Sequence, residues 1–307
     1  MLTAFISHQD CEQHNMGPEH PESPLRLVAI KRQLERSGLA QQLDHHSAVP
    51  ALAEQILLAH SRYHMEKLAF QLPEQGIVWT DDDTALCPHS LRAASLAVGS
   101  VILATNRVLN SKANNAFCAV RPPGHHAEHE LPMGFCLYNN VAIGALHALQ
   151  QPGIERVAIF DFDVHHGNGT VDIFKDRPEV MVCSTFQHPF YPDRYSYLER
   201  PNIINCPLPA FSDGYAFRKV VEQRCLPALQ AHKPDIIFIS AGFDAHAEDP
   251  MADLRLHEDD YRWVTQLLLS VANQYANGRL VSVLEGGYNP DALARSVEAH
   301  LQVLAGF

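Results

Sequence analysis

Short apolar runs rich in β-branched residues alternate along this chain with longer segments whose apolar residues recur at helical spacing. The runs Arg156–Asp161 and Asp235–Ser240 are apolar without alternation, which is typical of strands covered on both faces. Further strands are predicted over Leu2–Ser7, Ala116–Arg121, Val180–Thr185 and Leu280–Leu284. Helices are predicted over Pro24–Ser37, Leu91–Leu109, Asn140–Gln150, Asp213–Ala231 with Ser212 as its N-cap, Glu258–Ala276 and Pro290–Leu304. This alternation predicts an α/β fold with a central, mostly parallel sheet and helices on both faces.

The chain shows no sign of a boundary between domains. It has no internal repeat, no low-complexity segment and no linker rich in Gly or Ser, so residues 1–307 are predicted to form one domain. Apolar residues make up 46% of the chain and charged residues 19%, which suits a sizeable core. No apolar run approaches the ~20 residues of a membrane span, and the first residues lack the features of a signal peptide. We therefore expect a cytoplasmic protein that does not bind membranes.

Charge and residue counts narrow the classes of partner and site. With 23 Lys and Arg against 35 Asp and Glu, the formal net charge is −12, which argues against binding nucleic acid because phosphates need a basic face. The seven cysteines form no C-x-x-C pair, so neither a disulfide framework nor a cysteine zinc site is indicated. Histidine, with 19 copies, stands out and falls at particular points along the chain.

Those points follow the predicted strands directly. Strand ends run into PPGHHAEH, FDVHHGNGT, FQHPFYPD, AGFDAHAEDP and EGGYNPD. In a parallel sheet the carboxyl ends of neighbouring strands meet at one edge, and ligands bind in the crevice there. We therefore expect the His, Asp and Tyr side chains of these loops to line one pocket, although they lie far apart in the sequence.

Two of these loops offer ligands for a metal ion. Asp161, Asp163 and His165 are spaced with period two, which places them on one side of the chain. Asp244, from another strand end, can join Asp163 and His165 around one divalent ion. Two carboxylates and one imidazole leave Zn²⁺ an open position for water or substrate, as catalytic zinc sites require. Taken alone, the D-x-H triplet is more often a local hydrogen-bonded turn.

Two imidazoles and a phenol complete the expected pocket. His125 and His126 follow a rigid turn of two prolines and a glycine, and imidazole titrates near neutral pH, which suits general acid–base chemistry. Each ring needs a partner for its other nitrogen, and Asp161 and Asn168 are available. Tyr288 follows paired glycines, from where its hydroxyl could donate to an oxyanion. In isolation, the histidine pair would more often be a surface feature, and the tyrosine is as often a core residue.

Six segments together resemble the zinc-dependent histone deacetylase family, which includes bacterial deacetylase homologues and acetylpolyamine amidohydrolases. They are HPESPLR, RPPGHHA, GFCLYNN, DFDVHHGNGT, SAGFDAH and EGGY, and they run in this order from His20 to Tyr288. The RPPGHH and SAGFDA forms, with Asn168 instead of Asp after HHG, are similar to the class II branch. The resemblance implies an arginase-like α/β fold, in agreement with the alternation of strands and helices.

The resemblance also implies two kinds of metal ion. The implied ligands of the catalytic Zn²⁺ are Asp163, His165 and Asp244. Because such ligands tolerate several divalent ions, Fe²⁺ is an alternative in cells. A structural K⁺ is implied near Asp161, with Ser184 as a ligand, and Arg26 is implied to line an interior channel by which acetate leaves.

The family mechanism, carried onto this sequence, assigns the reacting groups. His126 is implied as general base and then general acid. His125 is implied as its electrostatic partner, hydrogen-bonded to Asp161, and Asn168 as the support of His126. Tyr288 is implied to polarise the acyl carbonyl as the metal-activated water attacks it.

Substrate contacts are implied around the mouth of the pocket. The Gly134 carbonyl is implied to accept from the substrate amide, while Phe135 and Tyr191 clamp the lysine methylenes. Tyr191 stands where the family usually has Phe. Asp83, in the acidic loop 81–83, is a candidate to hold the substrate backbone, although that loop could equally be a solvated turn. Met251, apolar at the rim, disfavours a site specialised for a polycationic amine.

These observations predict a zinc-dependent deacetylase that removes acetyl or another acyl group from lysine in proteins or peptides. The alternative is an acetylpolyamine amidohydrolase, whose substrate is a small acetylated amine. A di-manganese ureohydrolase shares the fold but has no need of the histidine pair and the tyrosine. A non-catalytic module that binds acyl-lysine would not require every catalytic residue type, and all of them are present.

Overall fold

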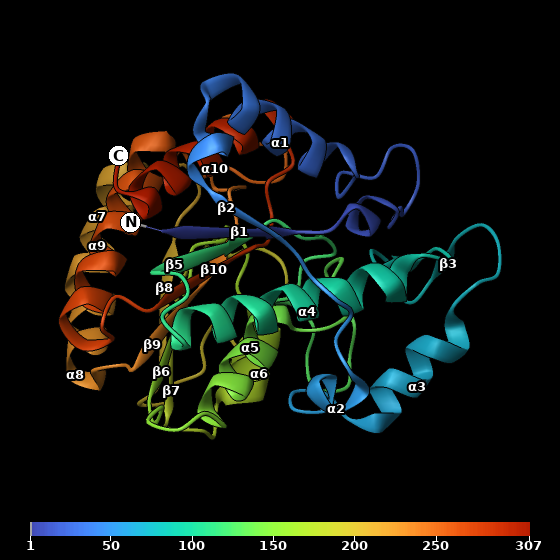
Figure 1. The fold of residues 1–307 in the computed structure, drawn as a ribbon, viewed down its shortest axis with the longest axis horizontal. Helices are drawn as coiled ribbons and strands as arrows, with labels where there is room; N and C mark the ends of the chain where they lie inside the picture. The colour runs from blue at the N-terminus through green and yellow to red at the C-terminus, as the bar shows by residue number, and fades with distance from the viewer. Residues whose placement is uncertain (1) are drawn as a thin grey trace.

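A parallel sheet of eight strands runs through the centre of the computed structural model, which describes residues 2–307 (Figure 1). The strand order is β2-β1-β5-β10-β9-β6-β7-β8, and neighbouring strands pair in parallel throughout. The bounds are β1 (Thr3–Ser7), β2 (Asp44–Ser47), β5 (Asn115–Cys118), β6 (Val157–Asp161), β7 (Val180–Gln187), β8 (Ile203–Leu208), β9 (Ile236–Ala241) and β10 (Leu280–Leu284). A separate antiparallel hairpin pairs β3 (Val78–Trp79) with β4 (Ala85–Leu86). The predicted α/β fold with a mostly parallel sheet is confirmed.

Helices cover both faces of the sheet, with α1 and α10 on one side and α4 and α5 on the other (Figure 1). Helix α10 packs between α1 and α9, while α5 packs against α4 and α6. The bounds are α1 (Leu25–Ser37), α2 (Ala53–Ile56), α3 (Arg62–Gln71), α4 (Ser90–Leu109), α5 (Asn140–Leu149), α6 (Asn168–Phe174), α7 (Gly214–Val220), α8 (Leu226–His232), α9 (Glu258–Tyr275) and α10 (Pro290–Ala305). Short 3₁₀ helices lie at Gln9–Glu12 and Leu39–Gln42. Among the helices within residues 2–307, none combines the length and the apolar character that crossing a bilayer requires.

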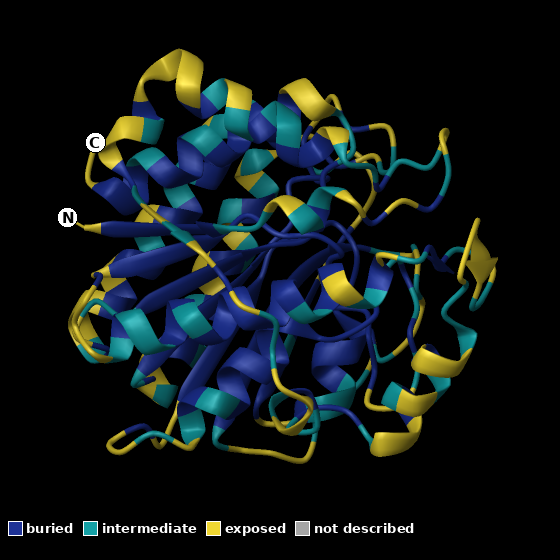
Figure 2. Ribbon diagram, turned by 45° about the vertical axis from the view of Figure 1, so that its right-hand side comes forward, coloured by how far each residue is buried: buried dark blue, intermediate teal, exposed yellow. Residues whose placement is uncertain are grey.

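The central strands form the core, and Figure 2 shows them buried beneath the helices. Every residue of β6, β9 and β10 is buried. Phe160 and Phe238, on neighbouring strands, are fully enclosed. Each enclosed aromatic or branched side chain contributes roughly 1.5–3 kcal/mol to folding. The strands are thereby held rigidly, so that the loops at their carboxyl ends start from fixed positions.

Two strands differ from the sequence prediction for local reasons. Strand β5 ends at Cys118, three residues before the predicted end at Arg121, because the chain leaves the sheet ahead of Pro122 and Pro123. Strand β8, which was not predicted, contains Pro207, and proline is tolerated there because β8 lies at the edge of the sheet. Strand β2, with the sequence DHHS, lies at the opposite edge and lacks an apolar pattern.

The helix predicted over Asp213–Ala231 is interrupted in the structure. A π-helical turn at Val221–Cys225 separates α7 from α8. The N-cap is Asp213 rather than Ser212, since the Asp213 carboxylate accepts a hydrogen bond from the Ala216 N–H at 3.1 Å. The helices α2, α3 and α6, which are ten residues long at most, were not predicted.

Candidate active site

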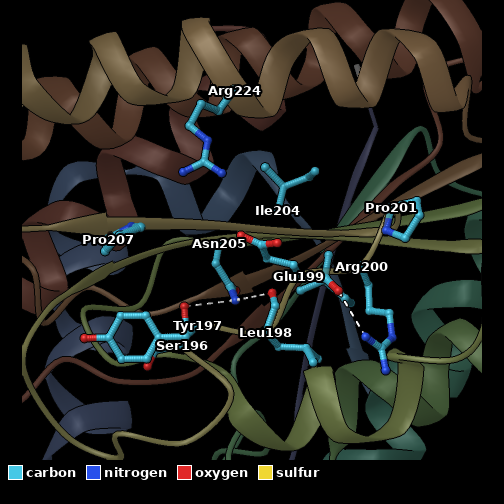
Figure 3. Close-up of a pocket in the computed structure, with 11 residues that line it drawn as sticks. Ser196, Tyr197, Leu198, Glu199, Arg200, Pro201, Ile204, Asn205, Pro207 and Arg224 are labelled. Atoms are coloured by element: carbon cyan, nitrogen blue, oxygen red, sulfur yellow. Dashed lines mark hydrogen bonds between the residues drawn. The ribbon is translucent and has the colours of Figure 1, made fainter.

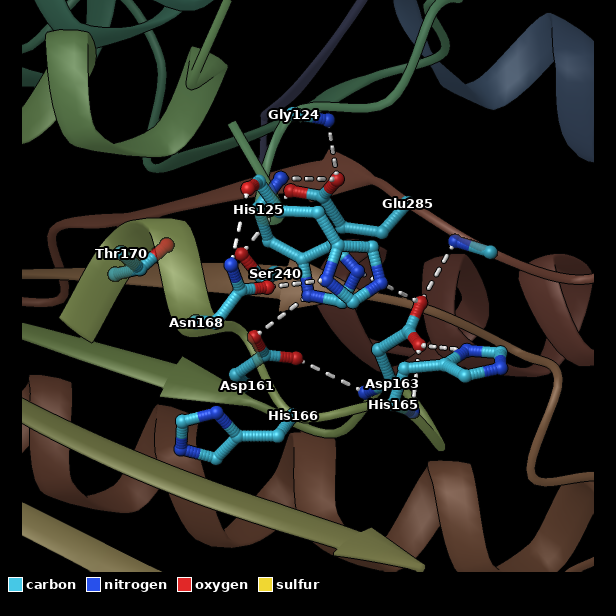
Figure 4. A network of polar contacts seen from close by, with 12 residues as sticks. Gly124, His125, Asp161, Asp163, His165, His166, Asn168, Thr170, Ser240 and Glu285 are labelled. Atoms are coloured by element: carbon cyan, nitrogen blue, oxygen red, sulfur yellow. Dashed lines mark hydrogen bonds and ion pairs between the residues drawn. The ribbon is translucent and has the colours of Figure 1, made fainter. Parts of the chain in front are cut away.

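The loops after β5, β6, β9 and β10 meet at the carboxyl edge of the sheet in one buried polar network (Figure 4). The four strands are consecutive in the sheet, so residues distant in sequence start from adjacent positions. Figure 4 shows His125, Asp161, Asp163 and His165 directed toward one another, whereas His166 points away. His166 instead contacts the Asn205 amide oxygen at 2.9 Å.

Asp163, His165 and Asp244 form a compact set of potential metal ligands. One ligand atom from each lies within 4.8 Å of the others, and all three residues are buried. His165 Nδ1 lies 3.1 Å from an Asp163 oxygen and 3.2 Å from an Asp244 oxygen. Burial alone would lower the pKa of His165, but the two carboxylates outweigh it and raise the pKa to about 10. The position therefore favours positive charge, and its donor set fits a divalent ion.

Two glycines allow these carboxylates to come together. A Cβ on Gly286 would lie 2.1 Å from an Asp244 oxygen and 2.6 Å from an Asp163 oxygen. A Cβ on Gly242 would lie 2.0 Å from an Asp163 oxygen. The Gly286 N–H also donates to Asp163 at 2.9 Å. Both positions need glycine because the backbone approaches the acids too closely for any side chain.

A second group of potential ligands, His246, His257 and Glu258, is differently arranged. His246 Nδ1 accepts a hydrogen bond from the Glu248 N–H at 3.1 Å, so the neutral ring carries its proton on Nε2. One Glu258 oxygen accepts from Arg295 Nε at 2.6 Å. Because His246 Nε2 carries a proton and the Glu258 carboxylate is paired with Arg295, this group is a hydrogen-bonded cluster and not a free set of metal ligands.

The two adjacent histidines have different partners. His125 Nδ1 lies 2.9 Å from an Asp161 oxygen, and His126 Nδ1 lies 2.7 Å from the Asn168 amide oxygen. Burial lowers the pKa of His125, but Asp163 and Asp161 overcome it and raise the pKa well above its ordinary value. For His126, burial and then the nearby His125 lower the pKa well below its ordinary value. At neutral pH this adjacent pair therefore consists of one cationic imidazole, His125, and one neutral imidazole, His126.

Residues predicted to contact substrate line a cavity of about 230 Å³ above this network. Phe135 packs edge-on to Tyr288 with ring centroids 5.8 Å apart, and Tyr191 packs edge-on to His126 at 5.3 Å. Phe190 stacks on the His165 ring at 5.4 Å. The lining residues are Asp83, His126, Gly134, Phe135, His165, Phe190, Tyr191, Met251 and Tyr288. The cavity thus has mainly apolar walls and a polar floor.

Backbone conformation shapes one wall of this cavity. Gly134 and Phe135 both have positive φ, of 57° and 68°. A Cβ on Gly134 would lie 2.4 Å from the His126 ring, so glycine is required for the loop to pack on that imidazole. The Asp83 carboxylate accepts from the Gly134 N–H at 3.0 Å. Asp83 is therefore fastened to the wall of the cavity, with its loop at the rim.

Tyr288 is held from below by a buried ionic cluster. The Arg26 guanidinium lies 5.1 Å from the centre of the Tyr288 ring. It donates to the Gly287 carbonyl at 2.6 Å and also to the Glu285 carbonyl. Glu22, fully buried, accepts from both Arg26 and Arg121. Arg26 is thus placed against the strand-end segment that carries Tyr288, and its role in a channel stays a prediction.

The predicted K⁺ ligands face each other across β6 and β7. Asp161 and Ser184 are register partners in the two strands. The Ser184 hydroxyl is buried and has no hydrogen-bond partner within residues 2–307. An orphaned hydroxyl oxygen beside a carboxylate fits a monovalent cation.

Sequence reasoning missed two acids that organise the site. The Glu285 carboxylate accepts from the N–H groups of Gly124 and His125 at 2.7 and 3.2 Å and from the Ser240 hydroxyl at 3.1 Å. Asp249 accepts from the Tyr288 and Asn289 N–H groups at 2.6 and 3.1 Å. Glu285 stood in a quoted motif, EGGY, but its partners belong to a loop far earlier in the chain. The sequence signal available for Glu285 was its position directly after the predicted strand Leu280–Leu284.

A larger hollow of about 570 Å³ lies beside β8 (Figure 3). Its lining includes Tyr197, Glu199, Arg200 and Arg224. Among the described residues that line it, none belongs to the metal-ligand set or to the histidine pair. Size therefore does not mark the functional cavity here, and the convergence of titratable groups does.

The sequence and the fold of this chain are similar to those of known proteins. The family model for the histone deacetylase domain matches residues 20–304. An uncharacterised protein of Synechocystis sp. is 40% identical over 99% of both chains, and a histone deacetylase-like amidohydrolase of Pseudomonas aeruginosa is 36% identical over 94% of this chain and 82% of its own. The crystal structure of the HDA15 HD domain matches with a TM-score of 0.93 and 31% identity, covering 99% of this chain and 88% of that one. The resemblance seen in the motifs is confirmed: this chain belongs to the histone deacetylase family and is a hydrolase acting on amide bonds.

Proposed function

We propose that this enzyme removes acetyl or another acyl group from the ε-amine of lysine in proteins or peptides. The observation that carries the proposal is a narrow, apolar-walled cavity whose floor joins a metal-ligand set, a neutral imidazole and a phenol. An extended methylene chain fits such walls, and its amide bond would lie at the polar floor. The proposal rests on that convergence together with the family.

Asp163, His165 and Asp244 would hold the catalytic ion, for which Zn²⁺ and Fe²⁺ both suit the ligands. When bound, the ion supplies Lewis acidity and lowers the pKa of water. Asp161 and Ser184 would contribute to a structural K⁺ site.

Side chains of this protein would then transfer the protons and stabilise the oxyanion. His126, neutral at pH 7, takes a proton from the attacking water as the oxygen bonds to the acyl carbon. It returns that proton to the lysine nitrogen as the C–N bond breaks. His125 stays cationic against Asp161 and contributes positive charge close to the developing oxyanion. The Tyr288 hydroxyl donates to that oxyanion.

Substrate would be gripped by the cavity walls. Phe135 and Tyr191 line the cavity and would flank the methylene chain, and the Gly134 carbonyl would accept from the substrate amide N–H. Asp83, at the rim, offers a carboxylate to the peptide backbone. Met251, also at the rim, offers no charge to a polycationic amine, which favours acyl-lysine over acetylpolyamine.

The test is a substrate panel with the purified enzyme. Peptides bearing acetyl- to long-chain acyl-lysine are compared with acetylputrescine, with and without a hydroxamate chelator. We expect hydrolysis of acyl-lysine peptides, inhibition by the chelator, and recovery with Zn²⁺ or Fe²⁺ after metal removal. Preference for acetylputrescine would overturn the substrate assignment. Two divalent ions per active site would support a ureohydrolase, and binding without turnover would support a non-catalytic module.

A matched pair of variants distinguishes the loss of a metal ligand from the general effect of removing one negative charge. Asp163→Asn removes one ligand carboxylate, whereas Asp176→Asn changes an aspartate that is 72% exposed. We expect only the former to lose metal and turnover. Equal behaviour of the two would contradict the assigned ligands.

A further inference from the structure

Behind His126 lies a buried carboxylate that the chemistry proposed above does not use. Glu128 is 5% exposed, and one of its oxygens accepts from the Asn168 amide nitrogen at 2.8 Å. Arg194 donates to both oxygens, from Nε at 2.7 Å and from Nη2 at 2.8 Å. Because the Arg194 guanidinium donates to both oxygens, each oxygen of Glu128 faces its neighbours as an acceptor.

These contacts decide which end of the Asn168 amide faces His126. On the side of Glu128, the amide also meets the main-chain oxygen of His126, at 3.3 Å. Both neighbours on this side are acceptors, so the NH₂ group must lie there. The amide oxygen must therefore face the imidazole, where it lies 2.7 Å from His126 Nδ1.

The orientation of the amide in turn fixes the proton on the ring. An amide oxygen only accepts, so Nδ1 of the neutral imidazole carries the hydrogen, and the lone pair is left on Nε2. If the amide were reversed, its NH₂ would need a lone pair on Nδ1, and the proton would move to Nε2. That tautomer cannot take a proton from water through Nε2.

We propose that Glu128 is a positioning residue, which holds the Asn168 amide so that His126 keeps the tautomer a general base needs. The inference rests on the hydrolytic role proposed for His126. Arg194 lies three residues after Tyr191, so the same ion pair also fastens the loop that supplies one wall of the cavity. Within residues 2–307, Glu128 belongs neither to the metal-ligand set nor to the lining of the cavity, and it acts through Asn168.

Exchanging the acid and the amide of this pair gives a sharp kinetic test. Asn168→Asp places two carboxylates against each other, so activity should fall. Adding Glu128→Gln places an NH₂ donor opposite the new carboxylate but removes the acceptor that Arg194 Nε uses, so the double variant should recover part of that loss. Glu128→Gln alone weakens the hold on the amide and should lower kcat about tenfold or more. Glu130→Gln, an exposed position on the same loop, is the matched control and should retain wild-type activity.

The pH profile distinguishes this role from a purely structural one. In the double variant, the carboxylate that Asn168→Asp introduces next to His126 stabilises the imidazolium, so the acid limb of kcat/KM should move to higher pH. In Glu128→Gln the limb should stay in place while kcat falls, because only the fraction of the competent tautomer changes. A double variant no more active than Asn168→Asp, or Glu128→Gln equal to Glu130→Gln, would overturn the proposal.

A spectroscopic measurement tests the tautomer without any turnover. Two-bond ¹H–¹⁵N spectra of the histidine side chains, with His126 assigned by its loss in His126→Gln, should show the Nδ1–H form in the wild type. They should show a growing Nε2–H population in Glu128→Gln. An Nε2–H form in the wild type would refute the inference even if deacetylation is observed. Absence of acyl-lysine hydrolysis with an Nδ1–H form would refute the proposed substrate instead.

Discussion

Replacing Glu22 by Gln should remove the carboxylate that balances the buried ionic cluster beneath Tyr288, while changing the side chain's shape very little. The Glu22 carboxylate accepts from Arg26 Nη1 at 3.0 Å and from Arg121 Nε and Nη2 at 2.5 and 2.6 Å. All three side chains are fully buried. The variant would leave two guanidinium groups inside the protein with a neutral amide between them.

The cost follows from how strongly the site favours the ionised acid. Burial alone raises the pKa of Glu22, but Arg121 and Arg26 outweigh it and lower the pKa from 4.5 to about 2. That difference corresponds to about 3 kcal/mol. Because the pKa in the folded state lies below that in the unfolded state, this contribution is complete at pH 7 and is lost only as pH falls through about 4.5 toward 2. Breaking one side of a buried ion pair typically costs a similar amount, about 3–5 kcal/mol.

Urea unfolding at pH 7 measures this loss directly. Glu22→Gln is compared with Glu19→Gln, which alters an exposed glutamate three residues away. We also expect lower activity of the folded variant, because Arg26 loses the partner that holds it against the Gly287 carbonyl. A loss of stability below about 1 kcal/mol, which is what an exposed pair contributes, would refute the reasoning.

Three further changes test other parts of the structure. Tyr288→Phe should lower kcat about a hundredfold or more at unchanged stability, because one oxyanion donor is lost, and steady-state kinetics would show it. Gly286→Ala should abolish zinc binding in a calorimetric titration, because a Cβ would lie 2.1 Å from an Asp244 oxygen. His300 is fully buried between the Thr265 and Ser282 hydroxyls, at 2.6 and 2.9 Å, and burial lowers its pKa to about 3. In the unfolded chain the His300 imidazole binds a proton below about pH 6.5, whereas in the folded protein it stays neutral down to about pH 3. The free energy of unfolding of the wild type should therefore fall by about 2 kcal/mol more between pH 7 and pH 5 than that of His300→Gln. Urea unfolding at pH 7 and at pH 5 would show the difference.

What the sequence could predict here follows from one rule of parallel sheets. Apolar runs such as Arg156–Asp161 marked the strands, and the motifs directly after them had to meet at one edge. The spacing of Asp163 and His165 alone left a local turn open, and the meeting of strand ends predicted Asp244 beside them, where the structure places it. The edge strand β2 escaped prediction because its sequence, DHHS, has no apolar pattern.

Supporting residues were harder to predict because their partners are set by packing and not by spacing. Glu22 lies in the HPESPLR segment and Glu285 in the EGGY segment, but neither acid was assigned a role from the sequence. Their functions depend on Arg121, which lies 99 residues after Glu22, and on Gly124, which lies 161 residues before Glu285. Nothing local distinguishes Glu22 from a solvated glutamate, and only its place directly after β10 distinguishes Glu285. Asp249 was hard to predict for the same reason, because its hydrogen-bond partner is the backbone N–H of Tyr288 at another strand end.

The charge of the buried network explains why an amide and not an acid supports His126. Four carboxylates already meet there, those of Asp161, Asp163, Asp244 and Glu285. Burial first, and then the nearby carboxylates of Asp161 and Asp163, raise the pKa of Glu285 to about 7. A fifth carboxylate at position 168 would also face Glu128 at hydrogen-bond distance. A neutral Asn168 avoids both repulsions and leaves His126 uncharged, so the same amide that relieves the network also preserves the general base.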